Sequence, residues 1–320
     1  MTDIRLLAVD LDGTLLDPSG ALTLRTRAAV AAAAARGVRI VLATARRYTG
    51  ALPVARALGC VDALLLYDGA QARAFPSGAN LFAQVLPAAV AQRAAELMAA
   101  RHLQPIAQHA PQVGEYLLVA PAAPRGAWAS AYLASAGQQV RQVPLAQLCA
   151  GHPDPQRVVA FGPLPRLRAL ARDLAGELPV DDAVRAEPPP DPLTAQIAMQ
   201  LLPAGNYGTA ELTVFAPGAS KGAALAWLAA RYNIPLAQTM AIGDGMNDVS
   251  LLQTAGLAVA MGTAPRALRR VADALTESNA EDGAARAIER YILARDPARA
   301  RAATAPGAGL PPAQPAAAAE

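Results

Sequence analysis

The chain has 320 residues, 53% of them hydrophobic and 17% charged, which supplies enough apolar side chains for a core and excludes wholesale disorder. A formal net charge of +3 is too small to indicate nucleic-acid binding, and two cysteines are too few for a disulfide framework or a structural zinc site. At roughly 150 residues per domain, the length predicts about two domains.

The first third of the chain alternates short apolar runs with helical patterns. The runs at 5–10, 39–43 and 63–67 are nearly continuous, which is typical of strands buried on both faces of a parallel sheet. Helices are predicted at 23–36 and 46–58, and each is followed by a glycine. This alternation, with right-handed crossovers, predicts a doubly wound α/β sheet.

The middle of the chain changes to helices that alternate with strand pairs. Helices are predicted at 88–101, 127–136 and 164–178, and strands at 104–109, 115–120 and 157–161. A hairpin is predicted where 194–202 and 209–215 flank a Pro-Ala-Gly-Asn turn. The proline-rich segment 187–192 is expected to lack regular structure. These patterns indicate a separate α+β unit.

The alternation of buried strands and helices then returns. Helices are predicted at 220–232, 247–255, 264–271 and 284–293, and strands at 239–242 and 257–261. We therefore predict a Rossmann-like core, built from residues 1–83 and 213–295, with an inserted α+β cap domain at 84–212. The Ala/Pro-rich tail at 296–320 has almost no large apolar residues and is expected to be disordered.

The sequence shows no sign of membrane attachment or export. No apolar run approaches the ~20 residues that a membrane span needs, because arginines interrupt every candidate. The N-terminus lacks the basic start and long apolar stretch of a signal peptide. We expect a soluble cytoplasmic protein, and the sequence leaves its oligomeric state open.

Polar side chains stand at the ends of three predicted strands. Asp10 and Asp12 end the first strand, Thr44 ends the second, and Asp244 to Asp248 (DGMND) follow a strand of the last third. Because ligands bind at the carboxyl ends of strands in open α/β sheets, these groups are expected to face one crevice. Clustered carboxylates without histidine or cysteine favour Mg²⁺ and phosphoryl chemistry.

Lys221 is the only lysine, and the other 27 of the 28 basic residues are arginines. The chain thus uses arginine wherever a generic positive charge suffices. A single lysine at the start of a predicted helix indicates a need for a compact point charge on a thin stem. We therefore expect Lys221 to join the carboxylates in the crevice.

Taken together, four motifs resemble those of the haloacid dehalogenase-like hydrolases, and their order and spacing are similar to the Cof-type subgroup with a large inserted cap. The motifs are DLDGTLL (10–16), SKG (220–222), GDGMND (243–248) and SNAEDG (278–283). The resemblance covers residues 1 to about 295. It implies a Mg²⁺-dependent phosphatase that acts on a small phosphorylated metabolite, such as a sugar phosphate.

The resemblance also implies a role for each matching residue. Asp10 would be the nucleophile that accepts the phosphoryl group, and Asp12 would be the general acid and base. Mg²⁺ would bind the Asp10 carboxylate, the main-chain carbonyl of Asp12 and Asp244. The phosphate would be held by Thr44, by backbone amides near Leu11 and Ala45, and by Lys221 and Asn247. Asp248 would support the metal or Lys221.

The sequence departs from the subgroup's pattern at three positions. Ala45 replaces a glycine, Asp68 replaces an asparagine, and Thr263 replaces an asparagine. None of these removes a proposed catalytic group, but they bear on substrate fit and phosphate affinity. Two alternatives of the same fold stay open: a sugar phosphomutase, and a catalytically weak phosphate-binding regulatory protein.

Two other classes fit the sequence less well. Residues 218–222 match the G-x-S-x-G motif of serine hydrolases, but all three histidines precede Ser220 and the required order places histidine after the serine. A receiver-type signalling domain would carry its phosphoacceptor aspartate after the third strand, and such a domain is far shorter than this chain.

Overall fold

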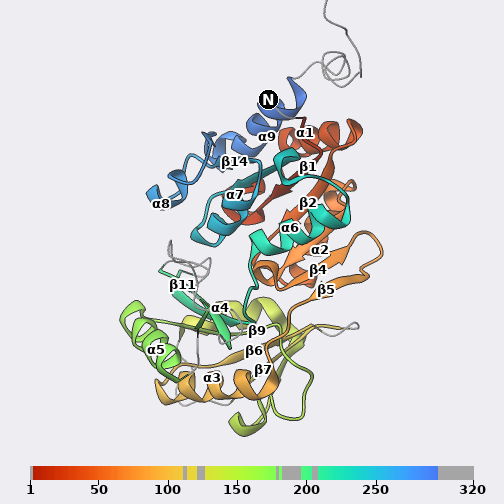
Figure 1. Ribbon diagram of the computed structural model, residues 1–320. Helices are drawn as coiled ribbons and strands as arrows, with labels where there is room; N and C mark the ends of the chain where they lie inside the picture. The colour runs from red at the N-terminus through yellow and green to blue at the C-terminus, as the bar shows by residue number, and fades with distance from the viewer. Residues whose placement is uncertain are drawn as a thin grey trace, which may run out of the picture.

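The computed structural model describes residues 3–110, 114–120, 127–177, 180–181, 196–203 and 208–294. Two sheets organise these residues, and Figure 1 shows the larger sheet with its helices above the smaller one. The predicted tail at 296–320 and the proline-rich segment at 187–192 lie outside the described residues.

In the described part of the chain the larger sheet has eight strands, in the order β15-β14-β13-β1-β2-β3-β4-β5. The pairs from β15 to β3 are parallel, and β4 and β5 add an antiparallel hairpin at one edge. The strands are β1 (Leu6–Val9), β2 (Arg39–Ala43), β3 (Ala63–Leu66), β4 (Gln71–Ala74), β5 (Asn80–Ala83), β13 (Thr239–Gly243), β14 (Leu257–Ala260) and β15 (Ala274–Leu275).

Helices cover both faces of this sheet because its central strands are apolar on both sides. Along β1, Leu7 and Val9 pack toward one face, whereas Leu6 and Ala8 pack toward the other. The first face is covered by α1 (Leu24–Ala35), α2 (Tyr48–Leu58) and α9 (Gly283–Ile288), and the second by α6 (Lys221–Arg231), α7 (Val249–Thr254) and α8 (Arg266–Arg269). This confirms the predicted doubly wound α/β fold.

The smaller sheet has seven strands among the described residues, in the order β10-β11-β12-β9-β6-β7-β8. Most of its pairs are antiparallel. They are β6 (Ile106–His109), β7 (Tyr116–Val119), β8 (Val140–Gln142), β9 (Arg157–Gly162), β10 (Val180–Asp181), β11 (Ile197–Leu202) and β12 (Ala210–Phe215).

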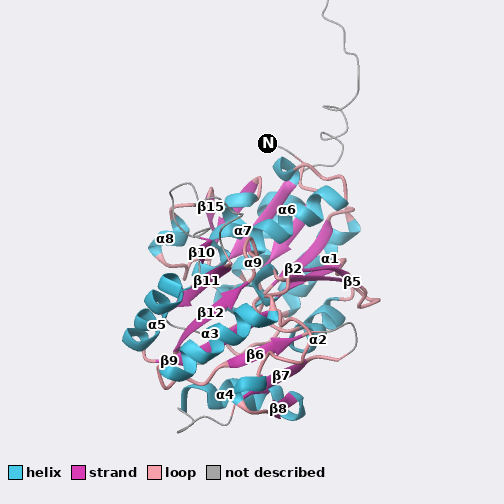
Figure 2. Cartoon of the chain, turned by 60° about the horizontal axis from the view of Figure 1, so that its bottom comes forward, coloured by secondary structure: helices cyan, strands magenta, loops and turns pink. Residues whose placement is uncertain are grey.

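Helices also flank the smaller sheet on both faces. Helices α3 (Ala88–Ala100) and α5 (Leu164–Glu177) pack on one face, and α4 (Ala127–Ala136) packs on the other. Figure 2 brings the side with α3 and α5 forward. The division of the chain at 84 and 212 stays a prediction; β12 of the smaller sheet runs on to Phe215.

The structure contains elements that the sequence patterns did not indicate, above all the β4–β5 hairpin. Strand β4 is only four residues long, and the residues that alternate with Gln71 and Arg73 are alanines, so it carries little apolar signal. The side chains of Gln71 and Arg73 are nonetheless buried, and Arg73 donates to the Gln71 amide oxygen and stacks on the Tyr48 ring. Pairing with β3 forms this strand, and a local pattern cannot reveal such pairing.

Two predicted helices end differently in the structure. The segment expected at 284–293 is α9 followed by a π-helical turn over Glu289–Leu293, and the segment expected at 264–271 is shortened to α8. Within the described part of the chain, no helix is both long and apolar enough to cross a membrane.

Candidate active site

The candidate site lies at the carboxyl ends of three adjacent strands. Strand β1 is paired with β2 on one side and β13 on the other. Asp10, Thr44 and Asp244 follow these strands and line a common crevice of about 780 Å³. The structure thus brings together groups that are more than 200 residues apart in the chain, as the parallel order of the strands requires.

Lys221 is fully enclosed beneath this crevice. Its side chain is 0% exposed, and Nζ lies 2.7 Å from Asp10 Oδ1 and 2.6 Å from Asp248 Oδ1. Lys221 is the first residue of α6, and the Ser220 hydroxyl caps that helix by accepting from the Ala223 amide. A buried ammonium needs paired charges to be stable, and the two carboxylates supply them.

The surroundings shift the pKa values of these groups. Burial raises the pKa of Asp10 well above its ordinary value, Lys221 opposes that shift, and Asp248 and Asp244 add to it. Burial alone would lower the pKa of Lys221, but Asp10 and Asp248 outweigh it and raise that pKa above its usual value. Burial also raises the pKa of Asp244 to about 6, although the Thr14 hydroxyl opposes the shift.

Three carboxylates can share a cation here. One oxygen each of Asp10, Asp244 and Asp248 lies within 4.8 Å of the others. An all-oxygen donor set of this kind fits Mg²⁺. Asp248 Oδ2, however, accepts from the backbone amides of Asp244 and Gly245, while its Oδ1 accepts from Lys221. Asp248 therefore holds the loop and the lysine in place and is less free than the other two to bind a cation.

The Asp12 carboxylate lies apart from this trio and is paired with Arg46. Arg46 Nε donates to Asp12 Oδ2 at 2.8 Å, and its Nη2 donates to Oδ1 at 2.5 Å. A two-pronged contact of this type fixes both the position and the plane of the carboxylate. Arg46 was not among the predicted site residues, although it stands two residues after Thr44.

The expected phosphate-binding residues lie on the loops around the crevice. Thr44, Ala45 and Asn247 line it, whereas the Leu11 side chain is buried in the core, and only its backbone was expected to act. The Thr44 hydroxyl accepts from the Arg46 amide, which shapes the loop after β2. Asn247 Nδ2 donates to Asp68 Oδ1 at 3.1 Å.

The smaller sheet supplies the opposite wall of the crevice. Its contributions are Tyr132, Ser135, Arg157, Leu202, Pro203 and Glu211. None of these residues could be predicted from the sequence, because the strands and helices of the insert carry no motif that distinguishes a crevice residue from any other. Thr263, one of the departures from the subgroup's pattern, also lines the crevice on the side of the larger sheet.

Gly69 allows the loop after β3 to approach the start of α6. Its φ is +96°, and a Cβ atom there would lie 2.2 Å from the Ser220 carbonyl oxygen. Gly37 has a φ of +81° with open space around it, so it is a matched control for the backbone conformation alone. The close approach at Gly69 thus places Asp68 beside the helix that begins with Lys221.

We expect Gly37→Ala to lower the free energy of unfolding by about 1–2 kcal/mol, the cost of a left-handed conformation with a Cβ atom. Gly69→Ala should cost more, roughly 3 kcal/mol or above, because the clash is with backbone. Gly69→Ala should also lower activity, because a shift of Ser220 would displace the next residue, Lys221, from its contact with Asp10. Urea denaturation and phosphate release on both variants check this, and equal effects would contradict it.

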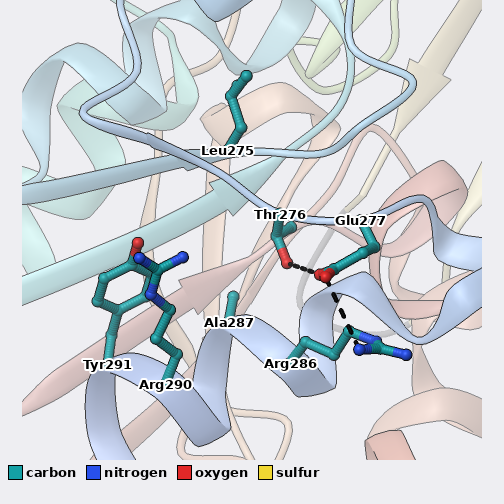
Figure 3. A pocket seen from close by; sticks show the side chains of 7 residues that line it. All are labelled: Leu275, Thr276, Glu277, Arg286, Ala287, Arg290 and Tyr291. Atoms are coloured by element: carbon teal, nitrogen blue, oxygen red, sulfur yellow. Dashed lines mark hydrogen bonds and ion pairs between the residues drawn. The ribbon is translucent and has the colours of Figure 1, made fainter.

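A second, smaller pocket of about 290 Å³ shares no residue with the crevice (Figure 3). Glu277 contacts Arg286 and Thr276 there, and Arg290 lies over the Tyr291 ring. The Arg286–Glu277 pair is 3.7 Å long and nearly half exposed. Surface pairs of this kind contribute little to stability, and this pocket brings together none of the carboxylates described above.

The fold and the site together define an α/β protein with a doubly wound parallel sheet and an aspartate at the carboxyl end of the central strand β1. A family model described as haloacid dehalogenase-like hydrolase matches residues 7–114 and 194–288. The chain therefore belongs to the haloacid dehalogenase-like hydrolases, which confirms the resemblance drawn from the motifs.

Curated relatives match over limited segments. The chain is 39% identical over 88 residues to the 5-amino-6-(5-phospho-D-ribitylamino)uracil phosphatase YcsE of Bacillus subtilis. The matched segment covers 28% of this chain and 35% of that protein. It is 47% identical over 74 residues to the phosphatase YwpJ of B. subtilis, covering 23% of this chain and 26% of that protein. The chain thus spans about a third or less of the length of these relatives.

Solved structures match over nearly the whole chain. A haloacid dehalogenase-like hydrolase from Bacteroides thetaiotaomicron covers 90% of this chain and 99% of its own, with a TM-score of 0.71 and 23% identity. A sugar phosphatase of HAD subclass IIB covers 90% and 98%, with a TM-score of 0.71 and 19% identity. At these identities the likeness establishes the fold.

Proposed function

We propose that this protein is a Mg²⁺-dependent phosphatase that hydrolyses a small phosphorylated metabolite through an aspartyl phosphate. The observation that carries the proposal is the buried contact of Lys221 with Asp10 and Asp248 at the base of a crevice that Asp244 also lines. Membership in the hydrolase family and relatives named as phosphatases support it.

In the proposed reaction, an Asp10 carboxylate oxygen attacks phosphorus and the ester P–O bond breaks. Asp12 donates a proton to the leaving oxygen. Water then attacks phosphorus, Asp12 takes its proton, and the bond between phosphorus and Asp10 breaks to release inorganic phosphate. Lys221 neutralises part of the charge that Asp10 and the phosphate bring together. Asp12 must carry the proton that it donates in the first step, so at least one of its two hydrogen bonds from Arg46 has to open beforehand.

The residues present fit a magnesium ion, because the carboxylates that converge at the crevice offer oxygen ligands only. Asp10, Asp244 and the main-chain carbonyl of Asp12 would hold it. When bound, Mg²⁺ supplies positive charge that stabilises the phosphoryl oxygens in the transition state. Thr44, Lys221, Asn247 and the amides near Leu11 and Ala45 would hold the phosphate, and Asp248 would support Lys221.

The substrate we propose is a sugar phosphate or a metabolite of similar size. A crevice of about 780 Å³ accommodates a molecule of that size. Glu211 on the smaller sheet offers a polar group to the part of the substrate that leaves. Burial raises the pKa of Glu211, and Arg157 opposes the shift.

The experiment that tests the proposal is a phosphate-release screen over a panel of phosphorylated metabolites. Wild-type protein is expected to release phosphate from at least one sugar phosphate with Mg²⁺ and to lose that activity when EDTA removes the metal. A bisphosphorylated sugar in the panel separates hydrolysis from isomerisation. No release from any member would contradict the proposal.

Replacing Asp12 by asparagine is expected to separate substrates by their leaving groups. The backbone carbonyl of residue 12 is retained, so Mg²⁺ binding should persist. Alkyl phosphates, whose leaving oxygen needs a proton, should lose about 10²–10⁴-fold in turnover. Aryl phosphates should lose less. The measurement is the steady-state rate of wild type and Asp12→Asn on one alkyl and one aryl phosphate ester. Equal losses of turnover on the two esters would argue against a role of Asp12 as the acid.

A further inference from the structure

One buried arginine of the smaller sheet reaches across the crevice to the larger one. Arg157, on β9, donates from Nη1 to Asp68 Oδ2 at 2.8 Å and from Nη2 to the Ala45 carbonyl at 2.9 Å. Its Nε donates to Gln108 on its own sheet at 2.9 Å. The side chains of Arg157 and Asp68 are only 4% and 7% exposed, so this is a buried ion pair between the two sheets.

The second oxygen of Asp68 continues the contact toward the site. Asp68 Oδ1 accepts from Nδ2 of Asn247, the amide proposed to bind phosphate. An amide nitrogen carries two hydrogens, so the one not used by Asp68 is left for another acceptor. The amide oxygen of Asn247 cannot donate a hydrogen bond, so the nitrogen must be the end that faces Asp68. The bond to Asp68 therefore fixes the orientation of the Asn247 amide at the crevice.

A neighbouring contact holds the same loop from the same side. Glu115, next to β7 of the smaller sheet, accepts from the Tyr67 hydroxyl at 2.6 Å and from the backbone amides of Tyr48 and Thr49 at 2.8 and 2.9 Å. The consecutive residues Tyr67 and Asp68 are therefore each paired with a buried residue of the smaller sheet. This arrangement makes the position of the loop depend on the contact between the two sheets.

We propose that Arg157 and Asp68 are positioning residues that connect the smaller sheet to phosphate binding by orienting Asn247. The proposal rests on the proposed function, which supplies the phosphate-binding role of Asn247. Asp68 stands where the subgroup's pattern has asparagine, so it adds a charge near a site for a dianion. Arg157 neutralises that charge, and its loss would leave the buried Asp68 carboxylate without the cation it pairs with.

The test is a double-mutant cycle on phosphate affinity. Wild-type protein, Arg157→Gln, Asn247→Ala and the double variant are titrated with inorganic phosphate in the presence of Mg²⁺ by calorimetry. Each single variant should bind roughly 10-fold more weakly, and the double variant should be no more than about 3-fold weaker than the worse single one. In turnover, Arg157→Gln should raise KM more than it lowers kcat.

A rescue variant and a matched control complete the experiment. Adding Asp68→Asn to Arg157→Gln removes the unpaired charge and should restore phosphate affinity to within about 3-fold of wild type. Arg39→Gln makes the same change in the Arg39–Asp62 pair, which lies at the start of β2 and outside the crevice, and it should leave affinity unchanged. Thermal melts confirm folding.

Three results would overturn the inference. The first is a loss of about 100-fold in the double variant, the product of the single losses, which would show that Arg157 acts independently of Asn247. The second is failure of Asp68→Asn to restore affinity in folded protein. Either result, in protein that hydrolyses phosphate esters, leaves the proposed function intact. The third is wild-type protein that hydrolyses phosphate esters but binds no phosphate, which also leaves the proposed function intact. Wild-type protein that neither binds phosphate nor hydrolyses an ester would overturn both proposals.

Discussion

Replacing Asp10 by asparagine is expected to lower the rate of phosphate release at least roughly 10³-fold while the protein stays folded. The carboxamide cannot serve as the attacking oxygen, so the covalent step is lost. Folding should persist because the amide has nearly the same shape in this 5% exposed position, and Lys221 retains Asp248 as its partner at 2.6 Å.

The measurement is phosphate release at saturating Mg²⁺, with thermal melts on the same preparations. Asp62→Asn is the matched control, since Asp62 also pairs with a basic side chain, that of Arg39, and accepts a backbone amide of the same sheet. It should keep wild-type activity. Near-normal turnover by folded Asp10→Asn would exclude the aspartyl-phosphate mechanism.

Replacing Lys221 by arginine is expected to abolish most of the turnover, although the charge is retained. The Lys221 ammonium lies between two carboxylate oxygens at 2.6 and 2.7 Å with no exposure to solvent. The guanidinium is a wider, planar fork with delocalised charge, and it cannot occupy the place of a point charge. A displacement of about 1 Å in such a site can cost roughly 10²-fold.

Lys221→Ala should be no more active, because it leaves Asp10 and Asp248 buried without their counter-charge. It should also be less stable, by about 3–5 kcal/mol, the usual cost of breaking a buried pair. Phosphate release and melts on both variants test these expectations. Full activity in folded Lys221→Arg would show that the single lysine of the chain is only a generic cation.

The sequence by itself determined the positions of the central strands and the ends where polar groups gather. Strands such as β1, β2 and β13 are buried on both faces, so they are continuous apolar runs that stand out locally. Their parallel order then places the residues that follow them at one edge. The positions of Asp10, Thr44 and Asp244 in one crevice could therefore be predicted before any tertiary contact was known.

Lys221 was also predictable, but for a compositional reason. Because the other 27 of the 28 Lys and Arg residues are arginines, the single lysine indicates a site that needs a compact charge. The structure places its Nζ against Asp10 and Asp248. The geometry of that contact was not predictable, because it depends on the close approach of Gly69 to Ser220.

Only the tertiary structure decided how the remaining polar groups pair. Arg46 with Asp12 and Arg157 with Asp68 are separated by 34 and 89 residues. With 27 arginines in the chain, composition and spacing cannot select which one meets a given carboxylate. The residues of the smaller sheet that line the crevice could not be predicted either. Which face of β9 and β12 turns toward the larger sheet is decided by tertiary packing, and a local sequence pattern does not encode that choice.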